Sequence, residues 1–195
     1  RFEYQVAAEL HHEFAMQGAA APAYGTICGG GENACILHYT ENSAVLNHGD
    51  LILIDAGAEY QGYAADITRT FPVNGKFSEP QKQLYEVVLQ AQLASLDVIR
   101  PGATLQQAQD VAAHALTEGL VKLGILHGSV EDNIEQATYR RYFIHGLGHW
   151  LGLDVHDVGD ARRGDKSTPF KPGMVLTVEP GLYIPADADD VDAKW

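Results

Sequence analysis

The 195-residue sequence has little cysteine and few basic side chains. Its two cysteines, Cys28 and Cys35, fit neither a CxxC motif nor the dense framework of a small disulfide-rich secreted protein, so we expect a reducing, cytoplasmic location. Lysine and arginine total 13 against 26 aspartates and glutamates, a net charge of −13. Without a basic cluster to neutralise phosphates, nucleic acid and anionic membranes are excluded as expected partners.

The sequence also lacks long apolar runs. None approaches the roughly 20 residues that span a bilayer, and the first residues do not form a targeting pattern. The length suits one globular domain with a sizeable core. Because the chain starts at Arg1 and stops at Trp195 just after an acidic loop, we expect both ends to continue in a longer protein.

Periodicity predicts three helices and five strands. Apolar side chains recur every four residues from Phe2 to Phe14 and predict a helix over 2–17 that stops at Gly18. Capping-box spacings, Ser78 with Gln81 and Thr104 with Gln107, predict helices over about 79–99 and 105–123. Strands are predicted over 34–39, 51–55, 64–71, 143–147 and 174–178. Strands and long helices without regular alternation indicate an α+β fold.

One internal similarity joins the two ends of the sequence. GDLILIDAG from Gly49 and GMVLTVEPG from Gly173 each have an acid six residues after the first glycine, namely Asp55 and Glu179. Strands often begin and end at glycine, so chance can produce this. The alternative is a pseudo-symmetric domain whose two halves each supply a carboxylate to a shared site.

Asp55 ends an apolar strand, where an unpaired carboxylate is costly to bury. A chain reversal near Tyr60 and Gln61 would place Asp66 opposite Asp55 in an antiparallel pair. Two facing carboxylates repel unless they share a proton or a cation, and a cation is the simpler solution if further ligands are near. Alternatively, Asp66 is a solvated strand or turn acid.

The stretch HGLGHWLGLDVHDVG contains His145, His149 and His156. It lacks the glutamate of an HExxH zinc helix, and Gly146 and Gly148 favour an extended or irregular run that allows close backbone approach. Each histidine taken alone could be an ordinary core or surface residue. If they join the carboxylates, a mostly oxygen ligand set favours Mn²⁺ or another hard to borderline ion over a thiolate-type zinc site.

Three long motifs in fixed order resemble the pita-bread metallopeptidases: IDAGAEYQGYAADITRTFPVNGKF, HGLGHWLGLDVHDVG and KPGMVLTVEPGLYI. The similarity extends over nearly all of residues 1–195 and is greatest to the bacterial Xaa-Pro aminopeptidase branch. It implies a pseudo-symmetric antiparallel sheet flanked by helices. It also implies cleavage of the N-terminal residue from peptides with proline in second position.

The resemblance further implies roles for seven residues. The implied ligands of two divalent ions, usually manganese, are Asp55, Asp66, His149 and Glu179. The implied attacking species is a hydroxide bridging the ions, with Glu179 as general base, while His38, His145 and His156 contact substrate and stabilise the transition state. Methionine aminopeptidases lack the counterpart of His145, which favours the proline-specific branch.

Two family features are missing from residues 1–195: a last glutamate ligand on an Arg-x-Glu-Asp strand, and a separate N-terminal domain. We therefore expect residues 1–195 to be an incomplete catalytic domain that forms homo-oligomers when full length. The alternatives are a prolidase restricted to dipeptides, a more remote creatinase-like hydrolase, and a non-catalytic module that binds peptides or proteins.

Overall fold

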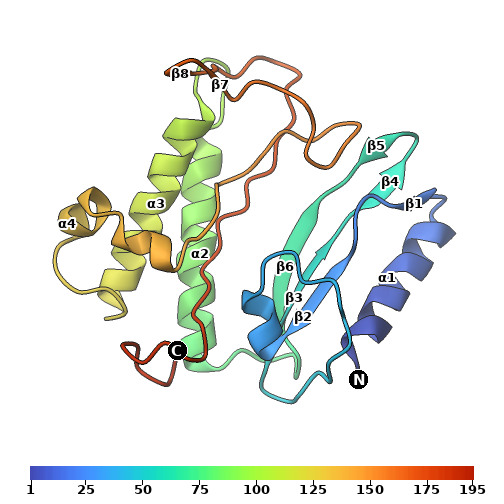
Figure 1. The fold of residues 1–195 in the computed structure, drawn as a ribbon, viewed down its shortest axis with the longest axis horizontal. Coiled ribbons are helices and arrows are strands. Elements are labelled where there is room, and N and C mark those ends of the chain that lie inside the picture. Colours follow the sequence, from blue (N-terminus) through green and yellow to red (C-terminus); the bar gives the residue numbers. More distant parts are fainter. The chain divides into compact units, whose positions relative to one another are not determined.

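The chain forms two compact units in the computed structural model, which describes all of residues 1–195 (Figure 1). Unit 1 comprises Arg1–Ser78 and Leu151–Val158, and unit 2 comprises Glu79–Trp150 and Gly159–Trp195. Unit 1 contains α1 (Glu3–Met16), β1 (Ala21–Pro22), β2 (Ile27–Gly30), η1 (Gly31–Cys35), β3 (Leu51–Ala56), β4 (Ala58–Tyr60), β5 (Tyr63–Ala64) and β6 (Ile67–Pro72). Unit 2 contains α2 (Glu79–Val98), α3 (Leu105–Lys122), α4 (Val130–Glu135), η2 (Thr138–Arg141), β7 (Arg162–Arg163) and β8 (Lys166–Ser167).

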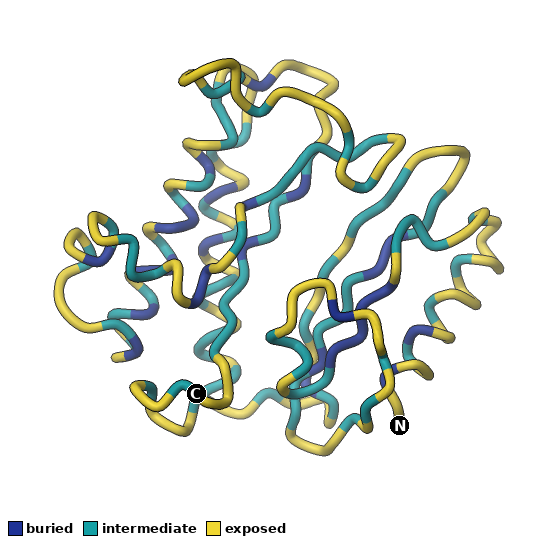
Figure 2. Tube along the Cα trace, in the orientation of Figure 1, coloured by how far each residue is buried: buried dark blue, intermediate teal, exposed yellow.

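Helix α1 packs against the sheet β2-β3-β6 of unit 1 (Figure 1). The helix predicted over 2–17 is confirmed, and Gly18 follows its end with a φ of +86°, which glycine adopts at low cost. Its apolar face and the sheet share a core in which Ala7, Cys28 and Ile52 are buried. The buried positions of unit 1 accordingly lie along its inner strands and the inner side of α1 (Figure 2).

Strands β3 and β6 pair antiparallel, with Asp55 opposite Thr68. The prediction that Asp66 lies opposite Asp55 is therefore wrong by two residues. The reversal occurs at Gln61 and Gly62, whose φ values are +52° and +85°, and a two-residue hairpin turn of this kind favours glycine at its second position. A shift of two residues preserves the side-chain alternation along the strand, so Asp66 and Thr68 are still expected on the same face.

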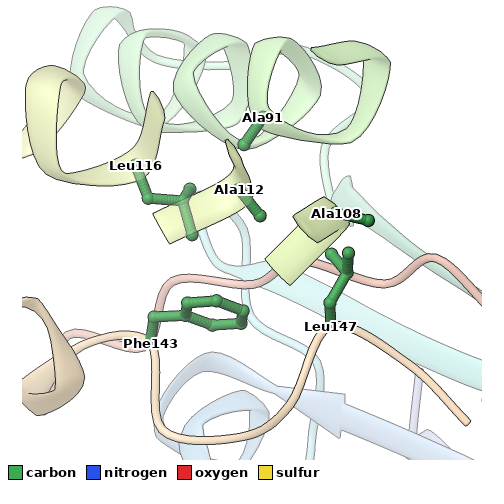
Figure 3. Packing of buried hydrophobic residues seen from close by; sticks show 6 residues of the cluster. All are labelled: Ala91, Ala108, Ala112, Leu116, Phe143 and Leu147. Carbon is green, nitrogen blue, oxygen red and sulfur yellow. The ribbon is translucent and has the colours of Figure 1, made fainter. Parts of the chain in front are cut away.

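Helices α2 and α3 form the core of unit 2. The Thr104–Gln107 capping box is confirmed, because the Gln107 amide donates to Thr104 Oγ1 and the Gln107 side chain accepts from the Thr104 amide. Small residues allow close helix approach, and Leu116 fills space beside them (Figure 3). The buried cluster contains Ala91, Ala108, Ala112, Leu116, Phe143 and Leu147.

Three of the predicted strands do not form. Residues 34–39 lie partly in the 3₁₀ helix η1, and neither 143–147 nor 174–178 is a regular strand. The last two segments nevertheless pair over a short stretch, since Glu179 N donates to Leu147 O and Thr177 N donates to His149 O. The numbering rises on one side as it falls on the other, so this pairing is antiparallel. The apolar composition of these segments predicted full strands, but it cannot distinguish a full strand from a short pairing of two backbone hydrogen bonds.

The glycines of GGG belong to strand β2 and to the turn after it, and the sequence did not predict this strand. Gly29 and Gly30 lie in β2, and only Gly31 has a positive φ, +56°. The strand β2 was missed because strand propensity disfavours glycine. A Cβ on Gly29 would lie 2.8 Å from Asn33 O, so a side chain here would clash with the turn that follows.

The two copies of the glycine repeat lie in different units, and their glycines have similar conformations and surroundings. The first glycines, Gly49 and Gly173, have φ values of +96° and +89°. A side chain would be crowded at both second glycines: a Cβ at Gly57 would clash at 1.7 Å with Ala65 O, and a Cβ at Gly181 would lie 3.0 Å from the Tyr183 ring, which would have to shift. The repeat is thus a shared local structure, which favours the pseudo-symmetric interpretation over chance.

Helices together with antiparallel strands confirm the α+β class. None of the helices has the length and apolar character required to span a bilayer.

Candidate metal centre

Asp55 and Asp66 of unit 1 share one phenol. Tyr24 Oη donates to Asp55 Oδ1 and lies 3.3 Å from Asp66 Oδ1. Burial raises the pKa of Asp55, hydrogen bonds from Tyr24 and Thr68 oppose this, the charge of Asp66 adds to it, and the pKa is raised overall. Burial and the two carboxylates raise the pKa of Tyr24 well above its usual range, so the phenol remains a donor. A partly buried acid pair of this kind would be stabilised by a cation.

Tyr24 reaches these acids because the chain bulges between β1 and β2. Pro22 pairs with Ala58 while Ile27 pairs with Asp55, so five steps along one chain face three along the other. Two extra residues in one strand bend it and redirect a side chain. The bulge therefore places Tyr24 beside Asp55, at the end of β3.

His38 and His156 lie near each other in unit 1. Their ring centroids are 6.5 Å apart, and both residues are exposed. His38 has a φ of +57° and contributes to lowering the pKa of Asp55, which places it within electrostatic range of that carboxylate. Two of the three accessory histidines thus lie with the two aspartates.

His149 and Glu179 are adjacent in unit 2. His149 Nε2 lies 3.2 Å from Glu179 Oε1. His149 Nδ1 lies 2.9 Å from the carbonyl oxygen of Trp150, which can only accept, so Nδ1 carries a proton and Nε2 is the ring nitrogen that a metal ion would bind. An imidazole nitrogen beside a carboxylate oxygen, with the opposite ring nitrogen bonded to a backbone carbonyl, is typical of a metal ligand pair.

Thr177 fixes the geometry of that pair. Its hydroxyl donates to Glu179 Oε1 at 2.6 Å and accepts from the His149 amide at 3.0 Å. The close approach depends on Gly148, where a Cβ would lie 2.1 Å from Thr177 O. The glycine before His149 therefore permits the backbone pairing that holds both candidate ligands, which confirms the expectation of close backbone approach at this position.

His145 occupies a separate place in unit 2. Its Nε2 lies 2.9 Å from Tyr183 Oη, and its ring packs edge-on against Phe143 and Tyr183. Its Nδ1 lies 2.7 Å from Gly146 O, so Nδ1 is the donor and Nε2 accepts from the tyrosine. His145 is thereby held by a phenol rather than by a carboxylate.

The seven candidate residues are divided between the two units, and His145 lies apart from the His149–Glu179 pair. Unit 1 holds Asp55, Asp66, His38 and His156, and unit 2 holds His149, Glu179 and His145. Sequence analysis missed three supporting residues, Tyr24, Thr177 and Tyr183. Thr177 could have been predicted, because residues two apart on an extended segment lie on the same face and Thr177 is two residues before Glu179. The bulge that positions Tyr24 has no comparable signal in the sequence.

The sequence matches Metallopeptidase family M24 over residues 1–194. The chain belongs to this metallopeptidase family. Among M24 relatives, the Xaa-Pro aminopeptidase of Haemophilus influenzae is 57% identical over 97% of this chain and 44% of its own length. The chain therefore spans less than half the length of that relative.

Solved M24 structures share the fold. Aminopeptidase PepP of Pseudomonas aeruginosa has a TM-score of 0.98 and 52% identity, covering 100% of this chain and 44% of that one. A zinc-substituted aminopeptidase P of Escherichia coli in complex with product has a TM-score of 0.94 and 56% identity, covering 97% and 43%. The predicted pita-bread fold is confirmed for this M24 chain, as part of a longer fold.

Proposed function

We propose that this chain belongs to a metal-dependent aminopeptidase that hydrolyses the bond between an N-terminal residue and a following proline. The observation that carries the proposal is the 57% identity to a named Xaa-Pro aminopeptidase, together with a ligand-type residue at each of the four implied positions. We also propose a reducing, cytoplasmic location, supported by Cys28 and Cys35, which are not joined in a disulfide, and a homo-oligomeric full-length enzyme.

The residues that would hold the metal are Asp55, Asp66, His149 and Glu179. The donor set fits divalent ions, since the acid pair bonded to Tyr24 supplies carboxylate oxygens and His149 Nε2 lies beside Glu179. Three carboxylates to one imidazole favour manganese over softer ions. When bound, a pair of such cations supplies Lewis acidity to the scissile carbonyl and acidifies a water molecule.

Different side chains would then accept the proton, stabilise the developing negative charge and orient the substrate. Glu179 accepts the proton of the attacking water, while Thr177 keeps its carboxylate oriented through Oε1. His38 and His156 donate to the oxygen that gains charge in the tetrahedral transition state. His145, fixed by Tyr183, orients the substrate.

The test is hydrolysis of matched peptides by the full-length protein loaded with Mn²⁺. We expect Xaa-Pro-Yaa to be cleaved after its first residue and Xaa-Ala-Yaa to be cleaved far more slowly, with Asp66→Asn abolishing both activities. Faster cleavage of the alanine peptide would refute the proline assignment. Preference for an Xaa-Pro dipeptide over the tripeptide would identify a prolidase instead.

A further inference from the structure

We propose that Glu3 is a positioning residue for His38, and that its carboxylate anchors the loop on which His38 lies. The proposal rests on the proposed function, in which His38 contacts the reacting oxygen. Glu3 itself lies on α1, outside the candidate ligands and accessory histidines.

Glu3 is a fully buried carboxylate, with 0% of its surface exposed. Its Oε1 accepts from Gly30 N at 2.8 Å and from Asn33 Nδ2 at 3.0 Å. Its Oε2 accepts from Tyr39 Oη at 2.7 Å and from Ala44 N at 2.9 Å. All four contacts are neutral donors; one comes from the last residue of β2, and three come from the loop that follows it.

The part of the loop 31–50 that surrounds His38 has little packing, whereas Leu46 near its end packs against the buried cluster of unit 1. Tyr39 is the only buried residue of the loop, while Ile36 and Leu37 are 53% and 44% exposed and His38 is also exposed. Exposed apolar side chains contribute little to fixing a loop. Tyr39, directly after His38, is therefore the residue next to this histidine that burial and a hydrogen bond to Glu3 hold in place.

Two side-chain anchors hold the loop, in addition to the backbone bonds from Glu3 N to Ala44 O and from Leu46 N to Arg1 O. One is Glu3 on Tyr39, reinforced by Asn33 Nδ2, which also lies 3.0 Å from Tyr39 Oη. The other is the Asn42 side chain, which accepts from Cys28 N and donates to Thr26 O, both at 2.8 Å. Asn42 fixes the return of the chain toward β2, while the Glu3 anchor acts on the residue next to His38.

The position requires a carboxylate. Each of its oxygens accepts two hydrogen bonds, and a glutamine has only one oxygen. Whichever way the amide turned, its NH₂ would face Gly30 N–H on one side or Ala44 N–H on the other, and neither can accept. Aspartate is shorter by one methylene and would not reach both sides. Burial raises the pKa of Glu3, but its four hydrogen bonds outweigh this and lower the pKa overall, which keeps the acceptor ionised.

Small displacements of His38 matter because it shares its surroundings with reacting groups. Its ring lies 6.5 Å from that of His156, and it affects the pKa of Asp55. A misplacement of about 1 Å caused by a change far from the chemistry can cost on the order of 100-fold in rate. Loosening the Tyr39 anchor would therefore reduce kcat without removing any group that touches substrate.

The decisive experiment is a double-mutant cycle in the full-length Mn²⁺ enzyme, cutting an Xaa-Pro-Yaa peptide. Glu3→Gln is expected to lower kcat by about 10- to 100-fold in the wild-type background. In a His38→Ala background it is expected to change kcat less than about twofold, because the group it positions is gone. Glu9→Gln, the same change on an exposed position of α1, is the matched control and should leave kcat unaltered.

Equal losses in both backgrounds would overturn the proposal, because Glu3 would then act on the fold and not through His38. Unchanged kcat for Glu3→Gln would overturn it as well. If Glu3→Gln does not fold, Tyr39→Phe replaces it in the same cycle, since it removes only the hydroxyl that Glu3 binds.

A second readout does not depend on activity. Hydrogen exchange of amides 36–44 in the wild-type protein and in Glu3→Gln should be faster in the variant, by at least about tenfold at Ala44 if its hydrogen bond is lost. An inactive wild-type protein with this faster exchange would refute the proposed function but support the anchor. Unaltered exchange in an active protein would refute the anchor alone.

Discussion

At the scale of single residues, neutral donors hold the carboxylates that matter most in this chain. Tyr24 donates to Asp55, Thr177 donates to Glu179, and Tyr39 donates to Glu3. A hydroxyl orients a carboxylate without neutralising its charge, so the acid stays available to a cation or a proton. In Asp55 and Glu179 such a hydrogen bond orients a candidate metal ligand, and in Glu3 it stabilises the fold.

The Glu3 network predicts a pH-dependent stability difference. The pKa of Glu3 is lowered on folding, so its contribution is complete above the unfolded value, about 4.3, and is lost as the pH falls through the lower folded value. At pH 7 we expect Glu3→Gln to lower the free energy of unfolding by about 1–3 kcal/mol, since buried donors lose their acceptor.

Urea unfolding of the wild-type chain and Glu3→Gln between pH 7 and pH 3 measures this difference. It should shrink below about pH 4 as the wild-type carboxylate is protonated. The exposed Glu9→Gln variant reports the effect of removing a charge from α1 without the network. A difference that stays constant down to pH 3 would show that ionised Glu3 does not stabilise the fold.

At the scale of elements, close backbone approach replaces a regular strand around the candidate ligands of unit 2, whereas Asp55 of unit 1 lies in the regular strand β3. His149 and Glu179 lie on a short antiparallel pairing of two backbone bonds, not on a full strand. Gly148 permits this pairing because it leaves space for the Thr177 carbonyl. On the other unit, Gly57 permits a similar approach to Ala65 beside the aspartates.

Two glycines of HGLGHW provide a matched pair for testing this. Gly148→Ala would place a Cβ 2.1 Å from Thr177 O, and we expect it to lower the free energy of unfolding by about 1–3 kcal/mol. Gly146→Ala meets no atom within 4 Å and should be neutral or slightly stabilising. Chemical denaturation of both variants measures the contrast, and similar losses for the two would contradict the proposed close approach.

The sequence predicted helices better than strands, for local reasons. Caps and four-residue periodicity are local signals, and α1, α2 and α3 lie within a residue or two of their predicted bounds. Strand β2 and the register of Asp66 depended on glycine contacts and on a turn at Gln61–Gly62, which are set by partners distant in sequence. The candidate ligands were predicted from long sequence motifs. The contact of Tyr24 with Asp55 could not be predicted in this way, because it depends on the bulge between β1 and β2.

At the scale of the whole molecule, one local structure, the glycine repeat that begins at Gly49 and again at Gly173, occurs twice. Each copy of the glycine repeat carries an acid, Asp55 in unit 1 and Glu179 in unit 2, between a positive-φ glycine and a glycine where a side chain would be crowded. The proposed function assigns both acids to one set of metal ligands. Metal binding is therefore expected to depend on both copies of the repeat.

Calorimetric titration of Mn²⁺ into the metal-free full-length protein tests this claim most directly. We expect Asp55→Asn and Glu179→Gln each to weaken the same binding event by more than about tenfold, since even supporting residues of metal sites cost about 10- to 100-fold when lost. Glu9→Gln should bind as the wild type does. Wild-type Mn²⁺ affinity in Glu179→Gln, with binding lost only in Asp55→Asn, would contradict the account.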